Sequence, residues 1–228
     1  MFDVIIPIRS GSTGLKNKNI LQFSGDYLVN FLIKKIIRIK LIRRIFILTD
    51  SKIYKKKIIH HKKINLEYIR PKSLSKKNSL AVDLIDHFIK WSDKKKFNLS
   101  NILLMQVTAP LLNKNEIVKT LNFINKNKIQ SLFHVSETLE HPNHIIKGYK
   151  NSWKNLIDNY KPKNRQDFIK YYFITGSTYF FKKNFFLKYK RPFNNKSYAF
   201  KVDKINFVDI DTKFEFEIAK KLINNKAR

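Results

Sequence analysis

The sequence opens with Phe2-Asp3-Val4-Ile5-Ile6-Pro7-Ile8 and continues with Arg9-Ser10-Gly11-Ser12-Thr13-Gly14-Leu15-Lys16-Asn17-Lys18-Asn19. The first part is a short β-branched apolar run, which predicts a buried strand. In the second part the glycines allow a tight turn that brings backbone N–H groups close to an anion, and the cations could neutralise phosphate charge. The closing Gly-Lys-Ser/Thr of a Walker loop is missing. The stretch therefore predicts either a phosphate-binding loop after the first strand or a basic, flexible surface loop.

Strands and helices alternate over the first half of the chain. Strands are expected at 2–8, 45–48, 66–69 and 102–107, and helices at 27–38, in the lysine-rich segment after residue 50, at 80–91 and after Asn113, which forms a capping-box pattern with Glu116. This alternation predicts an α/β fold: a mostly parallel sheet with helices on both faces. Ligands of such sheets lie outside the carboxyl ends of the strands, which is where Arg9, Thr49-Asp50, Arg70 and Gln106 fall.

The alternation is lost in the second half. Residues 130–205 contain short strand candidates at 131–135, 171–181 and 199–202, followed by an expected final strand at 205–208 and a helix at 212–222. The sequence contains no internal repeat and no linker rich in Pro or Gly. We therefore expect one domain over residues 1–228, with an irregular, β-rich insertion at 130–205.

The composition of the 228 residues excludes several classes of protein. Hydrophobic residues make up 43%, as in a folded globular protein, and cysteine is absent, which excludes disulfides, thiolate zinc sites and cysteine nucleophiles. No apolar run approaches the length of a membrane-spanning helix, and no basic leader precedes Val4. We expect a cytoplasmic protein without a membrane partner.

The formal net charge of +30 raises the question of nucleic-acid binding. The lysines, however, are spread along the whole chain and interleaved with Ile and Asn, as an AT-rich genome would impose on almost any protein. We expect no specific nucleic-acid partner, although such a surface would attract substrates that carry phosphate or carboxylate groups.

Asp209-Ile210-Asp211 is a candidate metal site. Alternation along an extended segment places both carboxylates on one face and turns Ile210 towards the core. Two such oxygen ligands suit Mg²⁺, which takes its remaining ligands from water and substrate phosphates. The alternative is that Asp211 merely caps a helix beginning at Thr212, which leaves Asp209 without a role.

The opening motif resembles that of the CMP-sialic acid synthetases, or acylneuraminate cytidylyltransferases, which has the form Arg-x-x-Ser-Lys-Gly-x-x-x-Lys-Asn. Arg9, Ser12, Gly14, Lys18 and Asn19 occupy its positions in register. Further landmarks follow in the family's order and spacing over nearly the whole chain: Thr49-Asp50, Arg70-Pro71, Gln106, Thr108, Pro110, His141-Pro142, Arg165-Gln166, Gly176, Tyr179 and Asp209-Ile210-Asp211.

This resemblance implies a nucleotide-diphospho-sugar transferase-like fold and transfer of CMP from CTP to the anomeric hydroxyl of an acidic nine-carbon sugar. It implies CTP contacts from Arg9, Ser12, Lys18, Asn19 and Arg70, to which we add Gly11 beside the phosphates. It places Gln106, Arg165, Tyr179 and Phe193 at the sugar, and Lys18, Asp209 and Asp211 at the reacting phosphate with Mg²⁺ on the two acids. It also implies a homodimer, in which the insertion of one subunit reaches the site of the other.

Several positions depart from the family pattern. Thr13 replaces a Lys, Lys77 an Asp, Leu112 an Arg and Thr175 an Asn. These changes predict altered sugar specificity, such as for a legionaminic- or pseudaminic-type acid, or a weakened relative. The alternatives are a cytidylyltransferase for an octulosonic acid, a CTP-binding regulator without turnover, and a basic nucleic-acid-binding protein. Arg165 alone fits either a sugar carboxylate or a solvated loop position.

Overall fold

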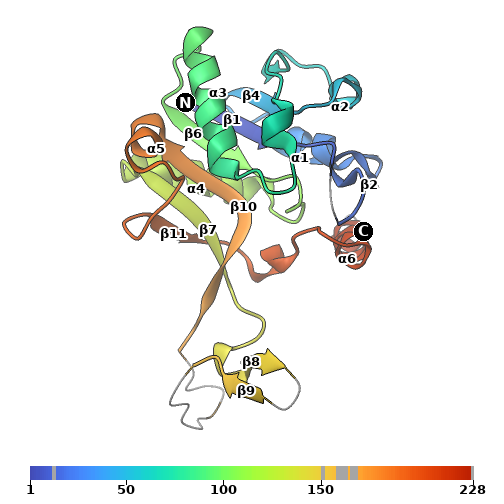
Figure 1. The fold of residues 1–228 in the computed structure, drawn as a ribbon, viewed down its shortest axis with the longest axis vertical. Helices are drawn as coiled ribbons and strands as arrows, with labels where there is room; N and C mark the ends of the chain where they lie inside the picture. Colours follow the sequence, from blue (N-terminus) through green and yellow to red (C-terminus); the bar gives the residue numbers. More distant parts are fainter. Residues whose placement is uncertain (12–13, 150–151, 158–163, 165–168, 227–228) are drawn as a thin grey trace.

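The protein is represented by a computed structural model, which describes residues 1–11, 14–149, 152–157, 164 and 169–226 (Figure 1). Its centre is a seven-stranded sheet in the order β11-β7-β10-β6-β1-β4-β5. β10 is antiparallel to both of its neighbours, and the other pairings are parallel. The strands are β1 (Phe2–Pro7), β4 (Ile42–Leu48), β5 (Ile64–Asn65), β6 (Asn101–Met105), β7 (Ser131–Glu137), β10 (Tyr172–Lys182) and β11 (Tyr198–Lys201).

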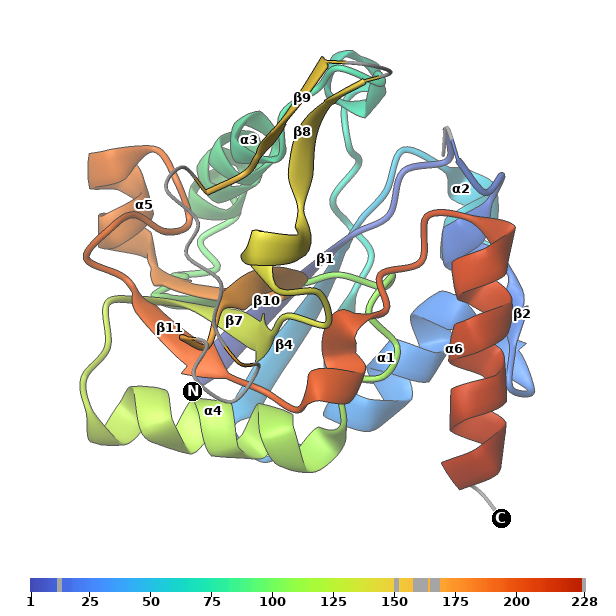
Figure 2. The ribbon, with the colours of Figure 1, turned by 90° about the horizontal axis from the view of Figure 1, so that it is seen from below.

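Helices cover both faces of this sheet, as the alternation predicts (Figure 2). One face packs against α1 (Leu28–Ile36), α4 (Lys114–Lys126) and α6 (Lys213–Lys226), and the other against α3 (Ala81–Lys94) and α5 (Lys183–Tyr189). Along β1 the side chains alternate between the two cores: Val4 and Ile6 join the first, whereas Ile5 joins the second. The smaller elements are η1 (Lys18–Ile20), β2 (Gln22–Phe23), β3 (Asp26–Tyr27), α2 (Lys52–Lys57) and η2 (Lys72–Ser75).

Two expectations about local structure need correction. The strand expected at 66–69 is displaced: β5 covers Ile64–Asn65, and Ile69 forms only an isolated parallel bridge with Thr49. The strand expected at 205–208 is wrong, because Lys204–Phe207 forms the 3-10 turn η5. Its cap is Asp203, whose side chain accepts a hydrogen bond from the backbone N–H of Ile205 (3.1 Å) and so favours a turn over a strand. The capping box of Asn113 and Glu116 at the start of α4 is confirmed.

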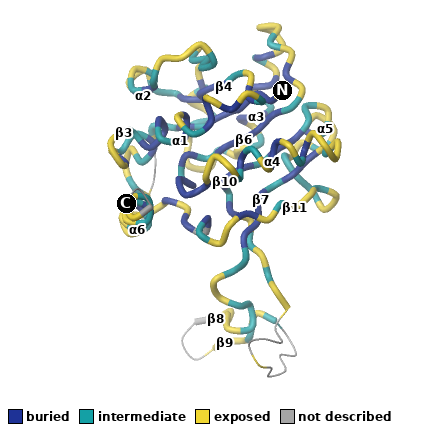
Figure 3. Tube along the Cα trace, turned by 180° about the vertical axis from the view of Figure 1, so that it is seen from behind, coloured by how far each residue is buried: buried dark blue, intermediate teal, exposed yellow. Residues whose placement is uncertain are grey.

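The span 130–205 divides into two parts. β7, β10 and β11 belong to the central sheet, whereas the 3-10 turn η3 (Pro142–His144) and the hairpin of β8 (Ile146–Tyr149) and β9 (Ser152–Asn155) extend away from it (Figure 3). Within the part of the chain that the structure describes, β8 and β9 pair only with each other. Among the described residues, no helix is long and apolar enough to cross a membrane.

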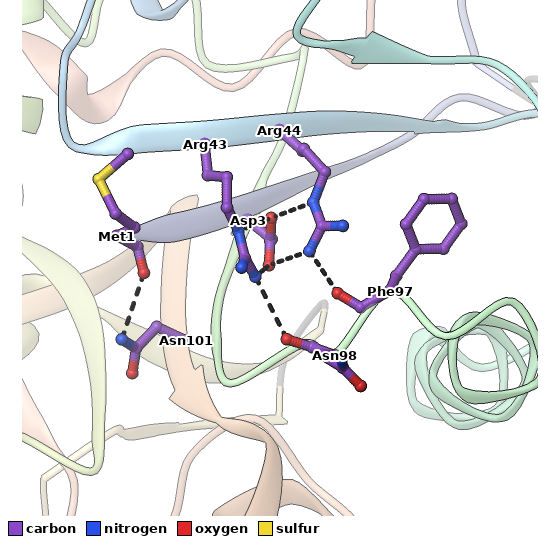
Figure 4. A network of polar contacts seen from close by, with 7 residues as sticks. All are labelled: Met1, Asp3, Arg43, Arg44, Phe97, Asn98 and Asn101. Carbon is purple, nitrogen blue, oxygen red and sulfur yellow. Dashed lines mark hydrogen bonds and ion pairs between the residues drawn. The ribbon is translucent and has the colours of Figure 1, made fainter.

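A buried carboxylate ties the amino ends of the strands together (Figure 4). Asp3 on β1 is 1% exposed and receives the guanidinium groups of both Arg43 and Arg44, with Nε–Oδ1 distances of 3.1 and 2.8 Å. The two arginines also donate to the carbonyl oxygens of Asn98 and Phe97, in the connection between α3 and β6. A buried charge is costly unless it is paired and hydrogen-bonded, and this network meets that requirement at the edge opposite the carboxyl ends.

The buried histidine of β7 generates a prediction about acid stability. His134 is 1% exposed, and its Nε2 lies 2.9 Å from Thr120 Oγ1; burial lowers the pKa of this histidine from 6.5 to about 3. Because the unfolded chain binds the proton more tightly, His134 contributes stability above pH 6.5 that is lost as the pH falls towards 3. In urea unfolding, we expect the wild type to lose about 2 kcal/mol more than His134→Gln between about pH 7 and about pH 5. Equal losses in both proteins would contradict this assignment.

Candidate functional site

A cavity of about 410 Å³ opens at the carboxyl edge of the sheet. Its walls come from the loop after β1, from η1, from the end of β6, from the middle of β10 and from the segment before α6. The lining residues are Arg9, Gly14, Lys18, Asn19, Gln106, Thr108, Gly176, Tyr179, Asp209 and Asp211. The fold therefore brings most of the residues expected at the site, from both ends of the chain, around one cavity.

The opening loop and the acidic pair are in direct contact. Lys18 Nζ lies 2.6 Å from Asp211 Oδ1 and 3.0 Å from the carbonyl oxygen of Ile210. The backbone N–H of Leu15 donates to the carbonyl oxygen of Asp211 at 2.9 Å. Gly14 fits closely here, because a Cβ at this position would lie 2.4 Å from the same carbonyl oxygen. Close backbone approach thus explains why a glycine stands at residue 14.

Asp209 and Asp211 lie on the cavity side, and Ile210 between them is fully buried. The backbone N–H of Ile210 donates to the carbonyl oxygen of Thr108 (2.8 Å), which fixes the segment against the end of β6. Asp209 is exposed to the cavity, yet the protein around its carboxyl raises the pKa, chiefly by burial and further by the charges of Asp211 and Glu215. A hydrogen bond from Thr108 and the charge of Lys18 oppose this rise.

Asp211 does not cap α6. The cap is a box formed by Thr212 and Glu215: Glu215 Oε2 accepts from the backbone N–H of Thr212 (2.7 Å), and Thr212 Oγ1 accepts from the backbone N–H of Glu215 (3.4 Å). Glu215 Oε2 also accepts from the backbone N–H of Asp211 (2.8 Å), a bond that lowers the pKa of Glu215. The capping alternative is therefore wrong, and the Asp211 carboxylate is available to the cavity.

The two arginines expected at CTP differ in their surroundings. Arg9 lines the cavity, and its Nη1 donates to the carbonyl oxygen of Lys76 (2.8 Å). Arg70 is buried behind it, and its Nε and Nη2 donate to the carbonyl oxygen of Leu74 (3.0 and 2.5 Å). Burial is the first cause of a lowered pKa for Arg70; Arg9 acts in the same direction and Asp50 opposes it. Arg70 thus holds the loop that follows it and does not line the cavity.

Of the residues expected at the sugar, the three that the structure describes lie on the β6–β10 side. Gln106 and Tyr179 line the cavity, and the backbone N–H of Gln106 donates to the carbonyl oxygen of Ser177 (3.0 Å). The ring of Phe193 stacks on Tyr179, with a centroid distance of 5.5 Å and an interplanar angle of 14°. Gly11 is exposed in open space and does not line the cavity. The expectations for Ser12, Thr13 and Arg165 fall outside the described residues.

Three lining residues were not predicted as site residues: Gly14, Thr108 and Gly176. Gly176 has φ 70° and lies where the β10–β7 register shifts, between Ile174 and Tyr179. A glycine inside a strand is a signal for such an irregularity. Here the positive φ requires it, since a Cβ would make only an ordinary contact with Asp209 Oδ2 at 3.5 Å. All three belong to the motifs that carry the family resemblance, but none was assigned a contact with CTP, sugar or metal.

Two of the departures from the family pattern lie inside the protein. Leu112 is 2% exposed and belongs to the core, and Thr175 is 4% exposed. Thr175 Oγ1 lies 2.8 Å from Ser177 Oγ, within the irregular part of β10. Neither residue lines the cavity.

Comparison with known proteins identifies what the chain resembles. The model of a family described as cytidylyltransferase matches residues 4–227. The chain is 28% identical over 219 residues to an N-acylneuraminate cytidylyltransferase of Streptococcus agalactiae serotype III (strain NEM316), covering 93% of this chain and 51% of that protein. It is 27% identical to a pseudaminic acid cytidylyltransferase of Campylobacter jejuni subsp. jejuni serotype O:23/36 (strain 81-176), covering 95% of this chain and 93% of that protein. The chain thus spans about half the length of the N-acylneuraminate relatives.

Solved structures confirm the fold class. The structure of CMP:2-keto-3-deoxy-manno-octonic acid synthetase complexed with CTP superposes with a TM-score of 0.68 over 99% of both chains, at 12% identity. A 4-diphosphocytidyl-2C-methyl-D-erythritol synthase from Anaerococcus prevotii superposes with a TM-score of 0.64 over 98% of both chains, at 15% identity.

The close approach of the opening loop to Asp211 is tested by a pair of glycine substitutions. Gly14→Ala places a Cβ against a backbone oxygen that cannot move without the segment before α6, so we expect a loss of about 1–3 kcal/mol of unfolding free energy. Gly11→Ala is the matched control, since a Cβ there meets nothing within 4 Å and its φ is not positive. Both are measured by chemical denaturation, and equal stability of the two variants would contradict the contact.

Proposed function

The chain belongs to the cytidylyltransferase family, and we propose that it transfers CMP from CTP to the anomeric hydroxyl of a sialic-acid-like nonulosonic acid, releasing pyrophosphate. The observation that carries the proposal is the cavity in which Arg9 and Lys18 face Asp209 and Asp211. The names of the relatives, N-acylneuraminate and pseudaminic acid cytidylyltransferases, support the substrate class.

CTP is proposed to bind with its phosphates against the opening loop. Arg9 and Lys18 line the cavity and supply positive charge. Asn19 is buried and joins the two ends of the loop, because its side chain donates to the carbonyl oxygen of Arg9 (3.2 Å). Lys18 forms a salt bridge with Asp211. We propose that its ammonium group contacts both the triphosphate and the acidic pair. Arg70 holds the loop that follows it by donating to the carbonyl oxygen of Leu74, and we propose that this loop lies beside the nucleoside of CTP.

Asp209 and Asp211 are proposed to hold Mg²⁺. Their carboxylates line one cavity, and the helix cap leaves the side chain of Asp211 available. Two carboxylates are sufficient for Mg²⁺, because this ion takes its other ligands from water and substrate phosphate. When bound, this ion supplies positive charge that stabilises the reacting phosphate and the leaving pyrophosphate.

The proposed reaction needs positioning and electrostatics and no covalent intermediate. The anomeric hydroxyl of the sugar gives its proton to Asp209 or to water, and its oxygen forms a bond to the α-phosphorus of CTP; the bond from this phosphorus to the bridging oxygen breaks, and its electron pair leaves with pyrophosphate. Lys18 and Arg9 offset the charge that develops on the phosphate oxygens. Gln106 and Tyr179 form the wall against which the sugar is oriented. We place the reaction in the cytoplasm, where nucleoside triphosphates are available.

An octulosonic acid is the second candidate substrate, since the superposed CMP:2-keto-3-deoxy-manno-octonic acid synthetase has the same fold. Only a substrate panel separates the two classes. The pseudaminic acid relative favours a nine-carbon sugar, because the match covers 93% of that protein.

The activity is tested by incubation with CTP, Mg²⁺ and N-acetylneuraminic, legionaminic, pseudaminic and octulosonic acids, with the CMP-sugar read by mass spectrometry. We expect pyrophosphate release only when CTP, metal and a nonulosonic acid are all present. Asp211→Ala is expected to lower kcat by at least about 10²-fold, because it removes charge stabilisation from the reacting phosphate. Asp83→Ala, an exposed acid on α3, is the control for the loss of one negative charge.

Three outcomes would contradict parts of this proposal. Full activity in Asp211→Ala would exclude the metal assignment. Product with the octulosonic acid alone would favour the second candidate. Sequence-specific, salt-resistant binding to nucleic acid without any affinity for CTP would favour a nucleic-acid-binding protein.

The protein is further proposed to form a homodimer through the β8–β9 hairpin. The hairpin protrudes from the rest of the protein (Figure 3). It carries exposed apolar side chains, Ile146 at 55% and Trp153 at 58%, and Leu156 directly after β9 is 45% exposed. Large apolar side chains on an element that pairs only with itself favour an intermolecular contact. We propose a second copy of the chain as the partner, with the hairpin reaching towards the partner's site.

Trp153→Ser tests the homodimer. We expect the wild type to elute with the mass of two chains in size-exclusion chromatography with light scattering, and the variant to shift towards one chain because it loses a large apolar contact. Phe214→Ser removes an aromatic side chain that is 74% exposed on α6 and should leave the dimer intact. A monomeric wild type would contradict this proposal.

A further inference from the structure

The opening loop rests on residues of the neighbouring strand and helix. β1 and β4 are parallel neighbours, and the backbone N–H of Ile8 donates to the carbonyl oxygen of Leu48 (3.0 Å), so the two strands end side by side. Ser10 and Asp50 each lie two residues beyond that bond. Ser10 donates to both oxygens of the Asp50 carboxylate, from its backbone N–H to Oδ1 (2.9 Å) and from Oγ to Oδ2 (2.8 Å). This pair of hydrogen bonds fixes the first part of the loop, which follows β1.

The last part of the loop, around Asn17, is held by Tyr54, which lies one helical turn after Asp50 in the chain. Tyr54 on α2 is 3% exposed, and its hydroxyl donates to Asn17 Oδ1 (3.0 Å) and lies 3.4 Å from the carbonyl oxygen of Ser10. Asn17 has φ 55°, a left-handed conformation that Asn tolerates better than most residues. Ser51 caps α2 by accepting from the backbone N–H of Tyr54 (3.2 Å), which keeps the tyrosine in place.

The clamped residues are the direct neighbours of the cations of the cavity. Arg9 precedes Ser10, and Lys18 follows Asn17. We propose that Asp50 and Tyr54 are positioning residues, which act through Ser10 and Asn17 to hold Arg9 and Lys18 at the spacing that the triphosphate requires. This inference rests on the function proposed above, and neither Asp50 nor Tyr54 lines the cavity. A displacement of a binding group by about 1 Å can cost about 10²-fold in rate, so such support matters.

A purely electrostatic role for Asp50 makes a different prediction. Its negative charge acts on Arg70 and so belongs to the same cationic neighbourhood. Asp50→Asn separates the two roles: its Oδ1 can still accept from the Ser10 backbone, and its Nδ2 can donate to Ser10 Oγ, so both bonds survive without the charge. If Asp50 acts by positioning the loop, Asp50→Asn retains activity close to that of the wild type. If Asp50 acts through its negative charge, Asp50→Asn is as impaired as Asp50→Ala.

The kinetic experiment compares Asp50→Ala, Asp50→Asn and Tyr54→Phe with the wild type. Asp50→Ala is expected to raise KM for CTP and lower kcat/KM by about 10–100-fold, with KM for the sugar little changed. Asp50→Asn should stay within about threefold of the wild type, and Tyr54→Phe, whose ring remains in the core, should lose about tenfold. Asp83→Ala controls for lost charge. Tyr27→Phe controls for a lost tyrosine hydroxyl, since it removes the contact with Lys57 and leaves the loop untouched.

Hydrogen exchange of the CTP-free protein gives a readout independent of turnover. Backbone amides of residues 14–20 should exchange faster in Asp50→Ala and Tyr54→Phe than in the wild type, while those of β4 and α1 keep their rates. Unchanged exchange and unchanged kcat/KM in both variants would overturn the inference, and so would an Asp50→Asn as impaired as Asp50→Ala. A wild-type protein without turnover would reject the proposed function. The exchange rates would still show whether Asp50 and Tyr54 hold the loop in place. If Asp50→Ala does not fold, Tyr54→Phe decides by the same two measurements.

Discussion

The salt bridge between Lys18 and Asp211 is the interaction on which the rest of the site depends. It joins a loop near the first strand to an acidic pair in front of the last helix, and the adjacent bond from the Leu15 N–H to the Asp211 carbonyl oxygen holds the two backbones together. Ion pairs exposed to solvent contribute little to the free energy of unfolding. The role of this ion pair is therefore to fix the relative positions of the loop and the acidic segment. It places opposite charges on facing walls of one cavity, where a triphosphate and a cation would need them.

The two edges of the sheet use charge in different ways. At the amino edge, Asp3 is buried and its charge is fully engaged by Arg43 and Arg44. At the carboxyl edge, Asp209 faces a cavity, with a carboxyl whose pKa is raised chiefly by burial, and the guanidinium of Arg9 donates to the carbonyl oxygen of Lys76. The first arrangement fastens strands together, and the second leaves charged groups exposed to a ligand. A buried carboxylate engaged by two arginines and a set of charges that remain open to a cavity thus separate structure from function within one sheet.

The parallel part of the sheet could be predicted from the sequence because β1, β4 and β6 are short apolar runs that end in polar loops. The acidic pair could be predicted because alternation is a local rule, and the buried Ile210 obeys it. The position of β10 could not. This strand is inserted antiparallel between β6 and β7, and its partners are chosen by tertiary packing that no local pattern encodes. The hydrogen bond from Arg70 to the carbonyl oxygen of Leu74 could not be predicted either, because it forms only when the loop between these two residues has folded. By contrast, the spacing of Thr212 and Glu215 is that of a capping box, so the sequence does contain the signal that makes Thr212, and not Asp211, the cap of α6.

The separation of the two halves of the cavity along the chain has a consequence for biosynthesis. Residues 9–19 are translated well before Asp209 and Asp211. A nascent or prematurely terminated polypeptide can therefore present the cationic loop without the carboxylates that face it. Such a product would attract nucleotides without offering them the acidic wall of the cavity, so the candidate site is complete only once the acidic pair has been translated.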